Sequence, residues 1–171
     1  DKYLPEVKKQ LMAVKQMTDK ILRINHIADN ISPINVDVRE LAENALNSVR
    51  VEAEVKNITT SCEGEAVWYC DPNMFEQILF NLIGNAVKYT GDGGQIKVRI
   101  SNENIAVTNY PANIDENIKE SLFEAFVTGG ESIGGHGLGL YVAKYFAELL
   151  GLELGCESLD DKVTFTIQRK E

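Results

Sequence analysis

The fold is decided by the stretch Phe75-Glu-Gln-Ile-Leu-Phe-Asn-Leu-Ile-Gly-Asn-Ala-Val-Lys-Tyr-Thr90. At 100° per residue, its polar row falls within an arc of roughly 80° and consists of Gln77, Asn81, Asn85 and Lys88. The opposite side is apolar and predicts a buried helix face, made of Phe75, Ile78, Leu79, Leu82, Ile83, Ala86 and Val87. Two amide oxygens and one ammonium group suit a phosphate with bound magnesium. The alternative is a surface helix that merely exposes amides.

The composition excludes several classes of protein. The chain has 171 residues, 44% of them hydrophobic and 25% charged, which is typical of a globular protein with one sizeable core. No apolar run approaches the roughly 18 residues of a membrane span, and the charged start lacks the apolar central region of a secretory signal peptide, so we expect neither in this stretch. The net charge of −9 argues against a nucleic-acid partner. Three cysteines without paired spacing predict reduced thiols rather than a zinc site or disulfides.

The N-terminal segment predicts one long helix over residues 4–30. Its apolar residues recur every three or four positions, as Leu4, Val7, Leu11, Val14, Met17, Ile21, Ile24 and Ile27 or Ala28. We refer to these residues as the seam, and their spacing favours packing against a partner helix. Asn30-Ile-Ser-Pro33 ends the helix, because the residue before a proline resists helical geometry.

A second unit begins near Asn35, with alternating helix and strand signals. Asp37 is expected to cap a helix from Val38 to Val49, and Asp71-Pro72 to start the helix that bears the polar row. The predicted strands are 52–60, 65–70, 95–101, 105–109, 152–157 and 162–168. Further helices are expected near 117–126 and over Leu138–Leu150, the latter closed by Gly151. Paired strands between helices favour an α+β fold, a two-layer sandwich of a mixed, mainly antiparallel sheet and about three helices, preceded by one long helix.

A glycine-rich segment precedes the last of these helices. Gly134-Gly-His-Gly-Leu-Gly-Leu140 places glycines at alternate positions before a helix start, where backbone N–H groups and the helix dipole favour an anion. The spacing fits neither a P-loop nor a convincing dinucleotide site. Taken alone, the segment could equally be a hinge.

Together, the two segments resemble the catalytic and ATP-binding domain of sensor histidine kinases, in the GHKL superfamily with its Bergerat fold. The resemblance rests on Asn-x-x-x-Asn-Ala-x-Lys-Tyr at 81–89, Leu122-Phe-Glu-Ala-Phe126, and then Gly135-His-Gly-Leu-Gly-Leu140, and it covers residues 35–169. It implies a dimerisation-type helix over residues 1–32 and an ATP-binding catalytic domain over 33–171. It also implies a cytoplasmic portion of a membrane-anchored sensor protein.

The resemblance also implies roles for individual residues. Asn85 would coordinate Mg²⁺, with Asn81 beside the metal and phosphates, Lys88 on a phosphate and Tyr89 at the adenine. The remaining nucleotide-binding positions would be Asn109, Ile114, Phe126, Gly135, Gly137, Leu138, Gly139, Leu140 and Thr164. Phe123 and Phe126 are expected to be core anchors. ATPases of the superfamily have a glutamate where this chain has Asn81, and an amide cannot accept the proton of water at neutral pH. Phosphoryl transfer is therefore favoured over hydrolysis.

Two stretches depart from the family pattern. Where the family has Asp-x-Gly-x-Gly, this chain has Asn109-Tyr-Pro-Ala-Asn113. A neutral amide carbonyl therefore replaces the carboxylate that accepts a hydrogen bond from the adenine amino group. Because Pro111 and Asn113 replace the two glycines, the loop must follow a different path. Segment 127–134 lacks the basic residue that many relatives place near the terminal phosphate, and Glu131 would repel it. We expect weak, magnesium-dependent ATP binding, in the upper micromolar range or weaker.

The phosphoacceptor histidine is expected to lie outside this chain. His26 lacks the acidic and Thr-Pro context of the family's phosphoacceptor motif and is interpreted as a helix-surface residue, whereas His136 is expected to face solvent. The predicted function is transfer of the ATP γ-phosphate to a histidine elsewhere, by a kinase that dimerises and passes the phosphate to a response regulator. The alternatives are a degenerate nucleotide-binding or dimerisation module without phosphotransfer, and a GHKL ATPase or anti-sigma-type kinase.

Overall fold

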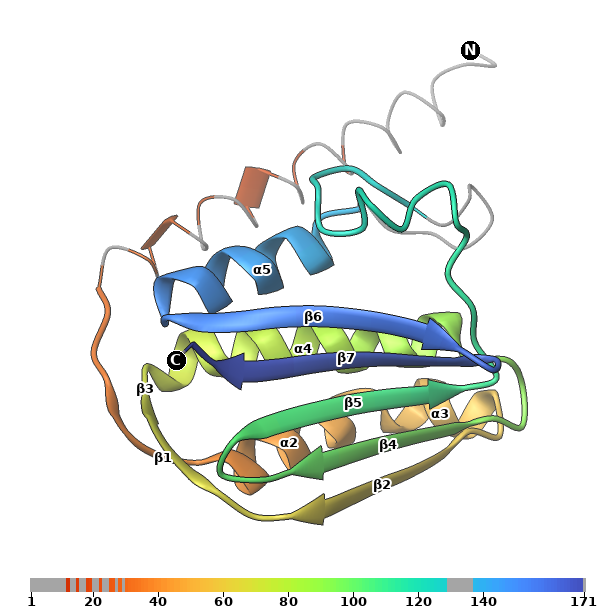
Figure 1. The fold of residues 1–171 in the computed structure, drawn as a ribbon, viewed down its shortest axis with the longest axis horizontal. Coiled ribbons are helices and arrows are strands. Elements are labelled where there is room, and N and C mark those ends of the chain that lie inside the picture. Colours follow the sequence, from red (N-terminus) through yellow and green to blue (C-terminus); the bar gives the residue numbers. More distant parts are fainter. Residues whose placement is uncertain are drawn as a thin grey trace. The chain divides into compact units, whose positions relative to one another are not determined.

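The computed structural model describes residues 30–128 and 137–170, together with Met12, Lys15, Thr18, Asp19, Leu22, Asn25, His26 and Ala28 (Figure 1). The chain forms two compact units, Asp1–Ile31 and Ser32–Glu171. Among the described residues, no helix combines the length and apolar character that a membrane span requires.

In the first unit, the described residues from Met12 to Ala28 are helical, as the periodicity predicts. His26 is exposed, and its backbone carbonyl accepts a hydrogen bond of 3.1 Å from Asn30 Nδ2. Apart from Ala28, the seam lies outside the described residues. The proposed role of this helix in dimerisation therefore stays a prediction.

The second unit contains the predicted mixed sheet (Figure 1). Its strands run in the order β2 (Thr59–Gly64), β4 (Gln95–Ile100), β5 (Asn104–Tyr110), β7 (Lys162–Arg169) and β6 (Leu152–Leu159). The pair β2–β4 is parallel, and every other neighbouring pair is antiparallel. A small antiparallel sheet joins β1 (Ile34–Asp37) to β3 (Val67–Cys70).

Four helices complete the described part of this unit: α2 (Val38–Ser48), α3 (Arg50–Val55), α4 (Pro72–Tyr89) and α5 (Gly139–Leu149). The core lies between the helices and one face of the sheet, because alternate strand residues such as Ile105 and Val107 are fully buried there. All seven residues of the predicted buried face of α4 are buried as well. The α+β two-layer fold is confirmed.

Local capping fixes where α2 and α4 begin. Asp37 Oδ1 accepts from the backbone N–H groups of Arg39 and Glu40, at 2.9 and 3.3 Å. Asp71 Oδ1 accepts from those of Asn73 and Met74, at 2.9 and 3.0 Å. Both predicted caps are confirmed.

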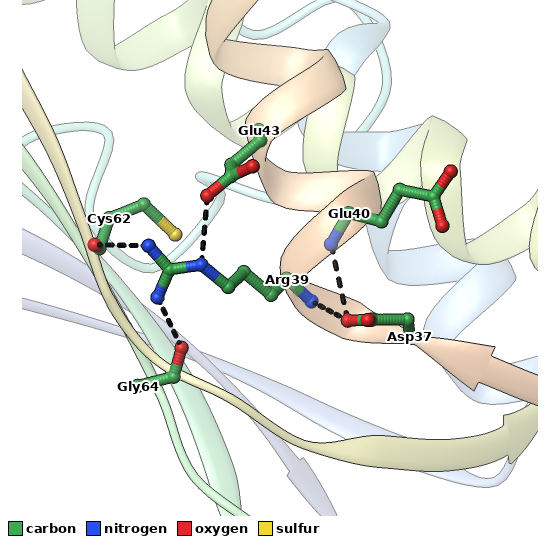
Figure 2. A network of polar contacts seen from close by, with 6 residues as sticks. All are labelled: Asp37, Arg39, Glu40, Glu43, Cys62 and Gly64. Atoms are coloured by element: carbon green, nitrogen blue, oxygen red, sulfur yellow. Dashed lines mark hydrogen bonds and ion pairs between the residues drawn. The ribbon is translucent and has the colours of Figure 1, made fainter.

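Arg39 also connects α2 to the edge strand β2 (Figure 2). Its guanidinium donates to the carbonyls of Gly64 at 2.9 Å and Cys62 at 3.4 Å, and pairs with Glu43 at 2.8 Å. These donors satisfy carbonyls on the open edge of the sheet, which would otherwise be available to another strand.

Three predictions about secondary structure are wrong. Residues 52–55, predicted as the start of a strand, belong to α3: apolar residues alternate here as in a strand, but of Val51, Ala53 and Val55 only Ala53 is buried. Residues 61–64, which lie between the predicted strands 52–60 and 65–70 and were expected to connect them, belong to β2, and β2 pairs with β4 rather than with β3. Residues 117–126 form successive turns instead of a helix, with hydrogen bonds such as Ile118 N–H to Asp115 O at 3.0 Å.

Candidate functional site

A pocket of about 360 Å³ opens where the C-terminal end of α4 meets the N-terminal end of α5. Strands β5 and β7 form its floor, and the connection that follows β5 forms one wall. The lining residues are Asn85, Lys88, Tyr89, Asn109, Asn113, Ile114, Asp115, Ile118, Leu122, Val127, Gly137, Gly139, Leu140, Val163 and Phe165. The structure thus brings together residues that the sequence separates by up to 80 positions (85 to 165).

The C-terminal half of the polar row of α4, Asn85 and Lys88, lines this pocket, whereas Gln77 and Asn81 are not among its lining residues. Tyr89 lines the pocket as well, and the Lys88 ammonium lies 5.0 Å from the centroid of the Tyr89 ring. Asn81 lies one turn before Asn85, and its Nδ2 donates to the Gln77 carbonyl at 2.9 Å. That bond directs Asn81 Oδ1 away from Gln77, so the amide oxygen remains available to a ligand.

The amide oxygens of Asn81 and Asn85 converge on the first turn of α5. A Cβ added at Gly139 would lie 3.3 Å from Asn81 Oδ1 and 3.8 Å from Asn85 Oδ1. Two neutral oxygens around one point are suitable ligands for Mg²⁺, which prefers hard oxygen donors and takes its other ligands from water and phosphate. Within the described part of the chain, no cluster of three or more His, Cys, Asp or Glu side chains is placed to hold a metal ion.

Asn109 provides a buried hydrogen-bond acceptor at the pocket floor. The residue is 2% exposed, and its Nδ2 donates to Thr90 Oγ1 at 3.1 Å. Its Oδ1 is buried and has no hydrogen-bond partner among the described residues. A buried carbonyl without a donor costs about 1–3 kcal/mol, so this oxygen favours a ligand that brings an N–H group.

The loop after Asn109 is held by the turn between β6 and β7. Ala112 N–H donates to Asp161 O at 2.8 Å, and Asn113 Nδ2 donates to Asp161 Oδ1 at 2.7 Å. The Tyr110–Pro111 peptide bond is cis. This path of the loop places Ile114, one of the expected nucleotide-binding residues, in the lining of the pocket.

Glycine is required at the other end of the site. Gly137 has φ +65°, and a Cβ there would lie 2.5 Å from the backbone carbon of Phe126. Phe126 N–H donates to Gly137 O at 2.9 Å, which brings the two ends of segment 126–137 together. The predicted phosphate contact of Gly135 and the position of His136 fall outside the described residues.

Some expected site residues lie elsewhere. Thr164 does not line the pocket: strand alternation turns it to the opposite face of the sheet, where its hydroxyl lies 3.0 Å from that of Thr108. Phe126 is 60% exposed and is therefore no core anchor, whereas Phe123 packs edge-on against Phe165 with 6.3 Å between ring centroids. Leu138 is buried as the residue before α5 and does not line the pocket.

Several residues that line the pocket are not among the site residues expected from the sequence. Val163 and Phe165 belong to the buried face of β7, which the alternation of Val163, Phe165 and Ile167 could have indicated. Asp115 and Ile118 follow β5 in an irregular stretch, and no local pattern marks them.

Comparisons with known proteins agree with this geometry. Residues 70–171 match the family model described as histidine kinase-, DNA gyrase B- and HSP90-like ATPase. Sensor histidine kinase AruS of Pseudomonas aeruginosa is 28% identical over 171 residues, covering 86% of this chain and 16% of AruS. Hybrid signal transduction histidine kinase K of Dictyostelium discoideum is 31% identical over 185 residues, covering 88% of this chain and 15% of that kinase.

A solved structure shares the fold. Histidine kinase ThkA, in a complex with the response regulator protein TrrA, superposes with a TM-score of 0.71 at 21% identity, over 99% of this chain and 50% of ThkA. This chain spans only 16% and 15% of the length of AruS and of histidine kinase K. The family match, the pocket and the order of its residues lead to one assignment. The chain belongs to the family of histidine kinase-, DNA gyrase B- and HSP90-like ATPases, and within this family it is similar to the ATP-binding catalytic domain of sensor histidine kinases.

Proposed function

We propose that the pocket binds ATP with Mg²⁺ and that the domain delivers the γ-phosphoryl group to a histidine on a phosphoacceptor helix outside this chain. The observation that carries this proposal is the unpartnered Asn109 Oδ1 in a pocket that also contains Lys88. Adenine has an exocyclic amino group that can donate to this oxygen, and triphosphate has the charge that a lysine complements.

Each part of the nucleotide has a matching group. Adenine contacts Asn109 Oδ1, with Tyr89 and Ile114 beside the ring, while Lys88 and the first turn of α5 meet the phosphates. Asn81 and Asn85 would hold Mg²⁺, which when bound neutralises phosphate charge. Among the described residues, Gly137 and Gly139 have no side chain and allow the backbone to approach the phosphates closely, and Leu140 lines the pocket beside them.

The chemistry proposed is transfer rather than hydrolysis. A histidine nitrogen forms a bond to the γ-phosphorus, the bond from that phosphorus to the β–γ bridging oxygen breaks, and ADP leaves. Catalysis of this kind is mostly positioning and charge neutralisation. Asn81 cannot remove a proton from water, and its amide is held by the Gln77 carbonyl.

The partners follow from the same proposal. The chain would act as the cytoplasmic catalytic part of a membrane-anchored sensor that dimerises, phosphorylates its own phosphoacceptor domain and passes the phosphate to a response regulator. The names of the relatives as sensor histidine kinases, and the solved complex of ThkA with a response regulator, support this assignment. The N-terminal helix would then belong to the dimerisation domain.

One observation favours a second function, a nucleotide-binding or dimerisation module without phosphotransfer. Pro111 and Asn113 replace the two glycines of the family loop, and Asn113 bonds to Asp161 instead of leaving the loop free to adjust.

Two measurements separate these functions. Calorimetric titration of the unchanged chain should show ATP binding in the upper micromolar range or weaker, and the binding should strengthen on addition of Mg²⁺. Asn85→Ala should abolish the effect of Mg²⁺, whereas Asn47→Ala on the exposed side of α2 should leave it unchanged. No heat and no displacement of a fluorescent nucleotide at millimolar ATP would refute the proposal.

The second measurement tests transfer. The chain is mixed with a separately produced phosphoacceptor helix domain and γ-labelled ATP, and acid-labile phosphohistidine is quantified. Labelled histidine supports the kinase, whereas ATP binding without labelled histidine supports the module.

A further inference from the structure

A chain of three polar groups leads from the end of α4 to the pocket floor. Thr90 Oγ1 lies 2.6 Å from the Ala86 carbonyl oxygen, and Asn109 Nδ2 lies 3.1 Å from Thr90 Oγ1. Thr90 and Asn109 are each 2% exposed, so water does not replace these bonds easily. Asn109 Oδ1, at the end of this series of hydrogen bonds, has no partner among the described residues.

The direction of these bonds determines how the Asn109 amide is oriented. A carbonyl oxygen can only accept, so the single Thr90 hydroxyl proton must point to Ala86. Thr90 Oγ1 can therefore only accept from Asn109, and the group that faces it must be the NH₂ of the amide. The carbonyl of Asn109 is thereby directed away from Thr90 and is left for a ligand. The orientation of the amide thus follows from the donor and acceptor properties of the Ala86 carbonyl and the Thr90 hydroxyl alone.

We propose that Thr90 is the positioning residue that makes this pocket selective for adenine over guanine. The proposal rests on the proposed function, since it assumes that a purine base reaches Asn109. At the position where adenine bears an amino group, guanine bears a carbonyl. The fixed Asn109 Oδ1 can accept a hydrogen bond from the amino group of adenine. Facing the carbonyl oxygen of guanine, it would have no proton to accept. The aspartate of related kinases has two acceptor oxygens in either rotamer, so only an asparagine needs such a lock.

The experiment compares ATP and GTP affinities by competition against a fluorescent nucleotide, in the chain as it exists. The unchanged protein should bind ATP about tenfold or more tightly than GTP, because a buried acceptor facing an acceptor is left unpaired. Thr90→Val removes the hydroxyl and keeps the shape, so either amide orientation becomes accessible. We expect its ATP to GTP preference to fall below about threefold. Thr90→Ser retains the hydroxyl and should retain the preference.

A double variant distinguishes the lock from a packing effect. Thr90→Val combined with Asn109→Asp places a carboxylate at the floor, which accepts in either orientation, and should restore a preference of about tenfold. Thermal melting verifies that each variant is folded. If Thr90→Val does not fold, the unchanged protein still tests the idea: NMR should show contacts between the Asn109 side-chain NH₂ and the Thr90 side chain.

The outcomes are separable. An unchanged ATP to GTP ratio in a folded Thr90→Val protein, or NMR contacts that place the Asn109 NH₂ away from Thr90, overturns the lock and leaves the proposed function standing. A parent protein that binds neither nucleotide overturns both. Loss of preference in Thr90→Val with recovery in the double variant supports the lock.

Discussion

Lys56 is predicted to hold the C-terminal end of α4, and Lys56→Met is the variant that tests this role. The Lys56 ammonium donates to the carbonyl oxygens of Val87, Lys88 and Thr90, at 2.7, 3.1 and 2.9 Å. The last carbonyls of a helix have no partner within the helix, and a cation there also complements the helix dipole. Methionine has a similar aliphatic length but cannot donate, so the variant isolates the ammonium.

The expected magnitude follows from these contacts. A hydrogen bond with a charged donor contributes about 1.5–3 kcal/mol, and the dipole adds about 0.3–1 kcal/mol. The three bonds share one ammonium group that is only half-buried, so they do not add and water replaces part of them. We expect the free energy of unfolding to fall by about 2 kcal/mol, which lowers Tm by about 7 °C for a unit of this size.

Urea unfolding provides the measurement. Trp68 is the chain's one tryptophan and is 1% exposed, so its fluorescence reports loss of the core next to α4. Lys162→Met, at an exposed lysine that begins β7, is the matched control and should change stability by less than about 0.5 kcal/mol. Lys56→Met should also weaken ATP binding, because Lys88 and Tyr89 at this end of α4 line the pocket. A Lys56→Met protein as stable as the Lys162→Met control would refute the reasoning.

Three further variants or measurements test other parts of the domain. Gly139→Ala should weaken Mg-ATP binding about fivefold or more, because its methyl group would lie 3.3 Å from Asn81 Oδ1. Gly84→Ala is the control: a Cβ there meets no described atom within 4 Å, so this variant should bind Mg-ATP as the parent does. Asp71→Ala should lower the free energy of unfolding by about 1–2 kcal/mol in thermal melts, since it removes the cap of α4, and an unchanged Tm would contradict the assigned cap. Burial raises the pKa of the Cys156 thiol to about 12, so at pH 8 the thiolate is about one part in 10⁴ of the total. Iodoacetamide should therefore label Cys156 far more slowly in the folded protein than in the urea-unfolded protein. The labelling rate of the folded protein should rise as the pH rises from 7 to 9. Equal labelling rates in the folded and unfolded states would contradict this prediction.

The features that could be predicted from the sequence are those that depend on neighbouring residues. The buried and polar faces of α4 follow from the period of 3.6 residues, and Asp37 and Asp71 cap helices through backbone groups only two and three residues away. Together with the glycine-rich segment and the family resemblance, this helix indicated a nucleotide site, and its residues Asn85, Lys88 and Tyr89 line the pocket. The same local reasoning failed at α3, because Val51 and Val55 alternate as in a strand, whereas packing buries Ala53 alone.

Only the tertiary structure decided which groups complete the pocket, since the deciding contacts join distant positions. Thr90 and Asn109 are 19 residues apart, and Lys56 lies 31–34 residues from the carbonyls of Val87, Lys88 and Thr90. The register of β7 likewise places Val163 and Phe165 at the pocket and turns Thr164 away, which a shift of one residue would reverse. The sequence by itself determined the polar helix and its family. Folding determined that Asn109 lines the pocket and that its buried Oδ1 has no partner among the described residues, because the orientation of the amide depends on a hydroxyl from another element.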